Sequence, residues 1–261
     1  VRRLGAARCS FLTYPEGCKD LNDVKMRHGP DAVVRVITEA KPYPVKGIYL
    51  LSDYPELDEP ATYSTGWPDL DEYLRVWLGE LMVVTGIPGH GKSTWTMNLC
   101  VNLARKHGWR VGVASFEIPT VPALRFKLRL AASGLGTKQW TRDDVAEADV
   151  FIQQHFVFID ADPTGEADDD MTLEWLLDRA ADAVMRHSIK VLVIDPWNEV
   201  EHYRPKGESE TQYINRALRQ IRKFALRYGV LAIVVAHPTK ELGKGGESRT
   251  PTLYDIEGSA A

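Results

Sequence analysis

The sequence predicts an α/β fold in which a mostly parallel central sheet is covered by helices on both faces. From about residue 61 onward, short apolar segments alternate with longer amphipathic ones, as in a chain of strand–helix units. The apolar segments are hydrophobic almost throughout, which is typical of strands buried on both faces of a parallel sheet. A glycine-rich loop at residues 86–93 lies between one such strand and the next helix. This arrangement is typical of the same fold class.

The first 60 residues form a separate region in this prediction. Its predicted elements are a strand at 9–14 and helices at 20–28 and 32–40. Asp20 or Asn22 can cap the first of these helices. Four prolines from residue 42 to residue 60 then indicate an extended linker. We therefore expect a domain boundary near residue 60, which gives domains at 1–60 and 61–261.

The second region is predicted to contain strands and helices in alternation, with two successive helices at one point. The predicted strands are 81–85, 111–116, 156–160, 191–195 and 231–236. The predicted helices are 92–106, 122–132, 143–154, 173–186 and 211–228. Ligands of such sheets bind beyond the carboxyl ends of the strands. Polar residues at those ends are therefore the candidates for a functional site.

Composition excludes several classes of protein. The chain has 261 residues, of which 44% are hydrophobic and 26% charged, as in ordinary globular proteins. Its net charge of −4 provides no global basic field, so contact with nucleic acid would need a local patch. Three scattered cysteines without metal spacing indicate reduced thiols. With no apolar run of membrane-spanning length and no signal peptide, we expect a cytoplasmic protein without membrane contact.

Residues 86–93 read GIPGHGKS, the full pattern of a phosphate-binding loop. Its glycines let backbone N–H groups close around phosphate oxygens, and the following helix presents its N-terminus to the same anion. Lys92 is expected to reach the β- and γ-phosphates, and the Ser93 hydroxyl to ligate Mg²⁺. A chance match in a glycine turn is the alternative, and the flanking strand and helix argue against it. The predicted nucleotide-binding residues are Gly86, Pro88, Gly89, His90, Gly91, Lys92, Ser93 and Thr94.

Asp195 ends an apolar strand segment, Val191-Leu-Val-Ile-Asp. A carboxylate at that position can hold Mg²⁺, usually through water, opposite Ser93. The alternative is a cap for a following helix, but Pro196 favours a sharp turn instead.

Two further strands end in polar residues. Glu117 could orient or deprotonate an attacking water, although its position alone does not distinguish it from a solvated loop glutamate. His237 could contact a γ-phosphate and report its loss, or could simply be a satisfied polar group at a strand end.

A glycine-rich segment with basic residues follows His237. Lys240, Lys244 and Arg249 could bind a polyanion backbone. Glu241 and Glu247 support the alternative, an ordinary solvated loop.

Several of these segments together resemble one family, the RecA-like helicase domain of the DnaB-type ring helicases. They are GIPGHGKST at 86–94, SFEIP at 115–119, VLVIDPWN at 191–198, AHPTK at 236–240 and DIEGSAA at 255–261. SFE followed by Ile, and His-Pro-x-Lys at the fourth segment, resemble the branch of phage primase-helicases and Twinkle. STGWPDLD at 64–71 is similar to the segment that cradles the nucleotide base.

The resemblance extends into the first region. Residues 15–33 resemble the tail of a TOPRIM primase domain, and residues 40–54 resemble linkers that pack on a neighbouring subunit. The acidic TOPRIM motif would lie before residue 1 and the family's arginine finger beyond residue 261. We therefore expect a segment of a longer protein, which binds ATP better than it hydrolyses it.

The resemblance implies an ATP-dependent 5′→3′ DNA helicase motor of a replicative primase-helicase in a bacterial or phage-infected cell. The implied cofactors are ATP and Mg²⁺. The implied partners are single-stranded DNA, further copies in a ring expected to be a hexamer, and replisome proteins. It assigns catalytic roles to Lys92, Asp195, Glu117 as water activator and His237 as γ-phosphate sensor. The candidate DNA-contacting residues are Lys240, Lys244, Arg249, Gly258 and Ser259.

Two other functions remain open at this point. One is a RecA-like recombinase or signalling ATPase, in which nucleotide drives assembly without unwinding. The other is a non-catalytic remnant that binds nucleotide as a structural ligand.

Overall fold

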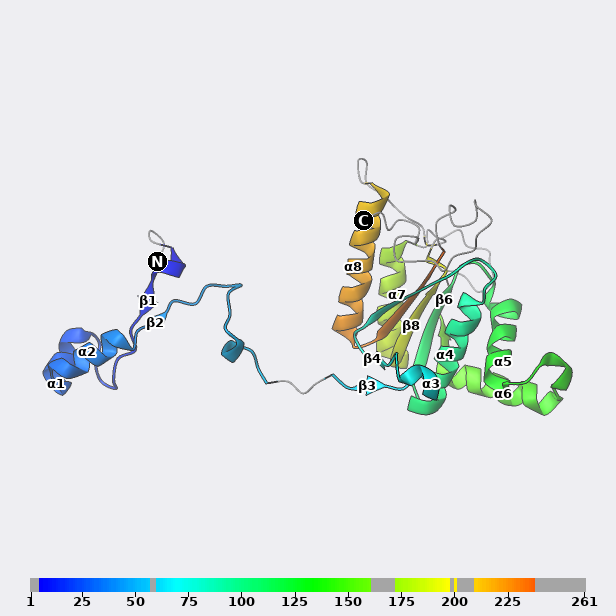
Figure 1. Cartoon of the computed structure of the whole chain (residues 1–261), viewed down its shortest axis with the longest axis horizontal. Coiled ribbons are helices and arrows are strands. Elements are labelled where there is room, and N and C mark those ends of the chain that lie inside the picture. The colour runs from blue at the N-terminus through cyan, green and yellow to red at the C-terminus, as the bar shows by residue number, and fades with distance from the viewer. Residues whose placement is uncertain (1–4, 57–59, 161–171, 198–199, 201–208, 238–261) are drawn as a thin grey trace. The chain divides into compact units, whose positions relative to one another are not determined.

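The computed structural model of the chain describes residues 5–56, 60–160, 172–197, 200 and 209–237 (Figure 1). It divides into two compact units, Val1–Glu59 and Pro60–Ala261. In the first unit, strand β1 (Ser10–Phe11) pairs antiparallel with β2 (Lys41–Pro42). Helices α1 (Leu21–His28) and α2 (Pro30–Thr38) lie between these strands in sequence.

The helices of the first unit begin where local chemistry favours it. Asp20 caps α1, because its carboxylate accepts a hydrogen bond of 2.8 Å from the Asp23 N–H. Helix α2 begins at Pro30, two residues earlier than expected, because proline is well suited to the first helical position. A small core of Val24, Ala32 and Val36 joins the two helices.

The second unit is built on a five-stranded sheet in which every neighbouring pair is parallel. Its strands are β5 (Leu81–Thr85), β6 (Arg110–Ser115), β7 (Phe156–Phe158), β8 (Ile189–Asp195) and β9 (Leu231–Ala236). Their order across the sheet is β5-β9-β8-β6-β7. A short antiparallel pair, β3 (Thr62–Tyr63) and β4 (Val76–Trp77), and the one-turn helix α3 (Pro68–Asp71) precede the sheet in sequence.

Helices cover both faces of this sheet (Figure 1). On one face lie α4 (Lys92–His107), α5 (Arg125–Ser133) and α6 (Arg142–His155); on the other lie α7 (Leu173–His187) and α8 (Glu210–Tyr228). Alternate residues of β8 serve the two layers: Leu192 and Ile194 contact the α7–α8 layer, and Val191 and Val193 contact the α4–α5 layer. From Val191 to Ile194 the strand is apolar, because both of its faces are buried there. The predicted fold class is thereby confirmed.

Several element boundaries differ from expectation. The strand expected at 9–14 is limited to Ser10–Phe11, β8 begins two residues early at Ile189, and further differences occur at the start of α5 and the end of β7. Helix α5 begins at Arg125 instead of residue 122, because the segment Thr120–Leu124 forms a wider turn. Pro122 in that turn has no N–H to donate to a regular helix. Strand β7 ends at Phe158, although the Ile159 N–H still donates to the Val113 carbonyl at 2.9 Å. None of the helices in the described part of the chain is long and apolar enough to cross a membrane.

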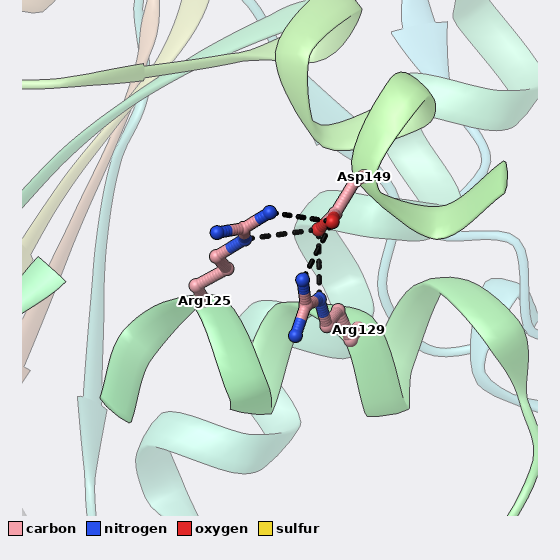
Figure 2. Close-up of polar contacts among 3 residues, drawn as sticks. All are labelled: Arg125, Arg129 and Asp149. Atoms are coloured by element: carbon pink, nitrogen blue, oxygen red, sulfur yellow. Dashed lines mark hydrogen bonds and ion pairs between the residues drawn. The ribbon is translucent and has the colours of Figure 1, made fainter. Parts of the chain in front are cut away.

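A shared carboxylate joins α5 to α6 (Figure 2). Asp149 of α6 accepts hydrogen bonds from Arg125 at 3.0 and 2.5 Å and from Arg129 at 2.7 and 2.5 Å. The two arginines are one helical turn apart, so both guanidinium groups reach the same side chain. Their hydrogen bonds, that of Arg129 first, hold the pKa of Asp149 well below its usual range. We call these three residues the Asp149 clamp.

Replacing the clamp carboxylate should destabilise the second unit. Asp149→Asn leaves two neighbouring guanidinium groups without their shared counter-charge, and we expect a loss of about 1–2 kcal/mol in the free energy of unfolding near pH 7. Because the pKa of Asp149 is lowered on folding, this stabilisation is present above the unfolded-state value of about 3.9 and lost as the pH falls further. Urea unfolding at several pH values measures the difference.

Glu147→Gln on the same helix is the matched control. Glu147 is exposed and forms no ion pair within the described residues, so its charge should contribute little. Equal losses in the two variants would show that the Asp149 clamp has no special role in stability.

Candidate functional site

The residues predicted for the site gather at the edge where the carboxyl ends of the parallel strands lie, here called the carboxyl edge. Strand β9 lies between β5 and β8, so His237, which follows β9, stands between the phosphate loop and Asp195. Ser115, the last residue of β6, pairs with Asp195, and Glu117 follows two residues later. The topology thus brings together four segments that are far apart in the sequence.

The phosphate loop connects β5 to α4. Gly89 and Gly91 have φ values of 81° and 83°, a region that favours glycine. Gly91 is the residue before α4, and its carbonyl accepts a hydrogen bond of 2.8 Å from the Trp95 N–H. Pro88, Gly89 and His90 are exposed, so the loop is open to a ligand. Gly86 precedes them, and Lys92, Ser93 and Thr94 form the first turn of α4.

The Lys92 ammonium group is held inside the loop. Its Nζ donates to the Gly86 carbonyl at 2.7 Å and to the Ile87 carbonyl at 3.4 Å. Burial lowers the pKa of Lys92, and the negative charges of Asp195 and Glu117 oppose this change. The cation therefore lies within the field of both carboxylates.

Asp195 is the most enclosed charged group of the site, with 8% of its surface exposed. Burial raises its pKa, and a hydrogen bond from the Ser93 side chain opposes this change. The charges of Lys127 and His237 also lower the pKa of Asp195, whereas Glu117 raises it. Ser93, Glu117 and His237 are thus all near enough to Asp195 to influence it.

This donor set fits a nucleoside triphosphate with Mg²⁺. A hydroxyl and a buried carboxylate that are close enough for one to affect the pKa of the other are suitable Mg²⁺ ligands when phosphate oxygens and water complete its coordination. The lysine held at the loop carbonyls is placed to move onto phosphate oxygens. Such a metal would neutralise phosphate charge, and Ser93 and Asp195 would hold it.

The segment 64–71 is held together by hydrogen bonds within itself and is joined to α4 by a further hydrogen bond. Asp71 accepts hydrogen bonds from the Thr65 N–H at 2.6 Å, from the Thr65 hydroxyl at 2.7 Å and from the Ser64 hydroxyl. These bonds, led by that of Ser64, lower the pKa of Asp71 to about 2. At the far end of α4, Lys106 Nζ donates to Ser64 Oγ at 2.8 Å.

Aromatic stacking joins the same segment to the start of α4. Trp67 stacks on Trp95, with ring centroids 5.7 Å apart. Sequence reasoning missed this pair; the available signal was a tryptophan two residues after the phosphate loop. That the segment cradles a nucleotide base stays a prediction.

Lys127 was also missed, although its charge acts on Asp195. The signal was helical spacing: Arg125 and Arg129 project from one side of α5, and Lys127, midway between them, projects from another. The predicted DNA-contacting residues cannot be placed, because they lie outside the described residues. They are Lys240, Lys244, Arg249, Gly258 and Ser259.

Two solved structures share this fold. One, described as an ATPase domain, matches with a TM-score of 0.59 at 15% identity, over 75% of this chain and 70% of that one. A DnaB-like replicative helicase, solved in a study of its interactions with primase, matches with a TM-score of 0.60 at 14% identity, over 92% of this chain and 59% of that one. At these identities the likeness establishes the fold.

Curated relatives match over most of the chain. The Twinkle homolog protein, chloroplastic/mitochondrial, of Arabidopsis thaliana is 34% identical over 284 residues, covering 100% of this chain and 39% of that protein. The DNA helicase/primase of Enterobacteria phage T3 is 26% identical, covering 94% of this chain and 45% of that protein. The chain thus spans about two fifths of the length of these relatives.

These relatives confirm the resemblance to the DnaB-type helicases and their Twinkle branch. A probable plasmid replicative DNA helicase of Chlamydia psittaci is also similar, at 24% identity over 75% of this chain and 43% of that protein. A family model described as an AAA domain matches residues 57–243, which is most of the second unit. The chain therefore belongs to the AAA-domain family.

Proposed function

We propose that this chain is the ATP-hydrolysing motor of a replicative primase-helicase, and that it moves 5′→3′ along single-stranded DNA. One observation carries the proposal: Asp195 ends one strand, and the phosphate loop, Glu117 and His237 follow its neighbours in the sheet at the same carboxyl edge. The names of the curated relatives, a Twinkle homolog and a phage helicase/primase, support unwinding as the work done with ATP.

Each residue of the site has a distinct task in this proposal. Lys92 and the loop N–H groups bind the phosphates, and Ser93 and Asp195 hold Mg²⁺. Glu117 orients the attacking water and accepts its proton. His237 follows the strand between the phosphate loop and Asp195, so it is suited to detect the terminal phosphate and relay its loss to the segment that follows it.

The proposal extends to assembly and location. Copies of the chain form a ring, expected to be a hexamer, with ATP between subunits and single-stranded DNA in the channel. Ring closure lets each subunit contact DNA weakly, which suits a chain of net charge −4. The protein would work in the cytoplasm, alongside replisome proteins.

The first unit is proposed to be the tail of a TOPRIM-like domain followed by a linker. Support comes from the apolar outer side of α2, where Val34 is 60% and Ile37 51% exposed. A helix pair with apolar residues on both its inner and outer sides is suited to be part of a larger domain.

Unwinding is the decisive measurement for this function. The full-length protein should separate a forked duplex only with ATP and Mg²⁺, and should require a 5′ single-stranded tail. ATP-dependent filaments without strand separation would favour a recombinase or signalling ATPase instead. A requirement for a 3′ tail would refute the proposed polarity.

Substitutions at the carboxyl edge should separate binding from hydrolysis. In the full-length protein, Glu117→Gln should lower the ATPase rate by about 10²–10⁴-fold while ATP still binds, because it removes only a base. Lys92→Ala should also weaken ATP binding, because it removes the phosphate-binding cation. ATPase assays and equilibrium binding of a fluorescent ATP analogue measure the two effects.

Glu147→Gln on α6 and Lys138→Ala are the matched controls, because both residues are exposed and neither follows a strand of the carboxyl edge. Unchanged hydrolysis in both site variants would mean that the catalytic assignments are wrong and that the nucleotide is a structural ligand.

His237→Ala should uncouple ATP hydrolysis from DNA. We expect the basal ATPase rate to change less than the rate in the presence of single-stranded DNA, because His237 links the phosphate site to the following segment. The ratio of the two rates is the quantity to measure. A ratio equal to that of the unmodified protein would refute the sensor role.

Removing two lysines after His237 should reduce the salt dependence of DNA binding. For Lys240→Ala with Lys244→Ala, the slope of log affinity against log salt should fall by about 0.7 for each DNA phosphate that is no longer neutralised. Titrations of labelled single-stranded DNA at several salt concentrations give the slope. An unaltered slope would exclude these lysines from DNA binding.

A further inference from the structure

The layer formed by α7 and α8 carries two rows of opposite charge. On α7, Glu174, Asp178 and Asp182 recur every four residues and are exposed, which places them along one side of the helix. On α8, Arg219, Arg222 and Lys223 are likewise exposed, and no acidic residue follows Glu210 in this helix. We call these the acidic row and the basic row.

The side chains of the basic row form no direct ion pair within the described part of the chain. Within the described residues, Arg219, Arg222 and Lys223 form no ion pair or hydrogen bond. The two helices share one ion pair, just before the basic row begins, where Arg216 Nη1 lies 3.9 Å from Glu174 Oε1. The basic row itself is available to a partner.

The two rows are in register. Helices α7 and α8 each return the chain between parallel strands, so they run in the same direction side by side (Figure 1). The Arg216–Glu174 ion pair places residues 174 and 216 at about the same level. Asp178 and Arg219 are then offset by one residue, about 1.5 Å along the helix axes. Asp182 and Lys223 are offset by the same distance.

Exposed apolar side chains continue both rows. Met185 is 78% exposed, Leu226 is 63% exposed, and the two are again one residue from the same level. A nucleic-acid backbone would gain nothing from these side chains and would be repelled by the acidic row. A protein with acidic, basic and apolar groups at the same spacing is the better complement, and this chain itself has that pattern.

We propose that a second copy of this chain docks on the α7–α8 layer about a two-fold axis that runs along the helices, midway between them. This operation places α7 of each copy over α8 of the other. Asp178 and Asp182 then face Arg219 and Lys223 of the second copy, and Met185 faces Leu226. Every contact occurs twice, as in any self-complementary interface. Opposite charges in matching positions fix the orientation of the copies.

This pairing does not depend on the proposed helicase function. It uses one helical layer and no residue of the phosphate loop or carboxyl edge. Its failure would leave ATP hydrolysis and unwinding untouched, and failure of those activities would leave the pairing untouched.

Sedimentation velocity of the 261-residue chain without nucleotide tests the pairing. We expect a concentration-dependent dimer at low ionic strength that dissociates as salt screens the exposed charges. Arg219→Glu with Lys223→Glu should weaken self-association at least about tenfold, because like charges then face each other. Asp178→Lys with Asp182→Lys should do the same.

An equimolar mixture of the two charge-reversed chains is the most informative sample. In a two-fold contact, the acidic groups introduced at positions 219 and 223 of one variant meet the basic groups introduced at positions 178 and 182 of the other. The unchanged Asp178 and Asp182 meet the unchanged Arg219 and Lys223, so the mixture should form a dimer again. Asp143→Lys with Glu147→Lys on α6 is the matched control and should leave association unchanged, because α6 covers the opposite face of the sheet. Thermal unfolding checks that every variant is folded.

If the charge-reversed variant of α8 does not fold, the double substitution Arg219→Gln with Lys223→Gln takes its place. This neutral variant should also weaken the dimer. A monomer at about 100 µM and low salt would overturn the proposal. So would a mixture that stays monomeric, an equal loss in the α6 control, or an assembly of more than two copies that the reversals dissolve.

Discussion

The second unit depends on one constraint: five parallel strands must bury both faces and end at one edge. Burial on both sides makes β9, and β8 from Val191 to Ile194, apolar up to that edge, so the next polar group of each segment lies there. The insertion of β9 between β5 and β8 then decides which polar groups become neighbours. The carboxyl edge thus concentrates charge because the remainder of the sheet excludes it.

The same constraint explains what could be predicted from the sequence. Strands β5 and β9 were located to the residue, because apolar runs bounded by glycine or by polar residues are unambiguous. The phosphate loop was recognised from local pattern alone. The start of α5 was misplaced, because a wide turn and a helical turn share the same composition around Pro122.

Contacts that depend on relative helix positions could not be predicted. The Asp149 clamp requires α5 and α6 to meet at one height, and Trp67 reaches Trp95 only after the segment 64–71 has folded onto α4. No sequence spacing encodes these heights. His237 and Glu117 were found as strand ends, but only the strand order shows that they flank Asp195. Their chemical roles remain predictions.

The attachment of segment 64–71 to both ends of α4 has a mechanical consequence. Ser64 accepts a hydrogen bond from Lys106 at one end of the helix, and Trp67 stacks on Trp95 near the other end. A tilt of α4, caused by a change at its phosphate-binding end, would therefore move this segment together with the helix. Because residues 64–71 directly follow the boundary between the two units, a movement of this kind would reach the connection to the first unit without passing through the sheet.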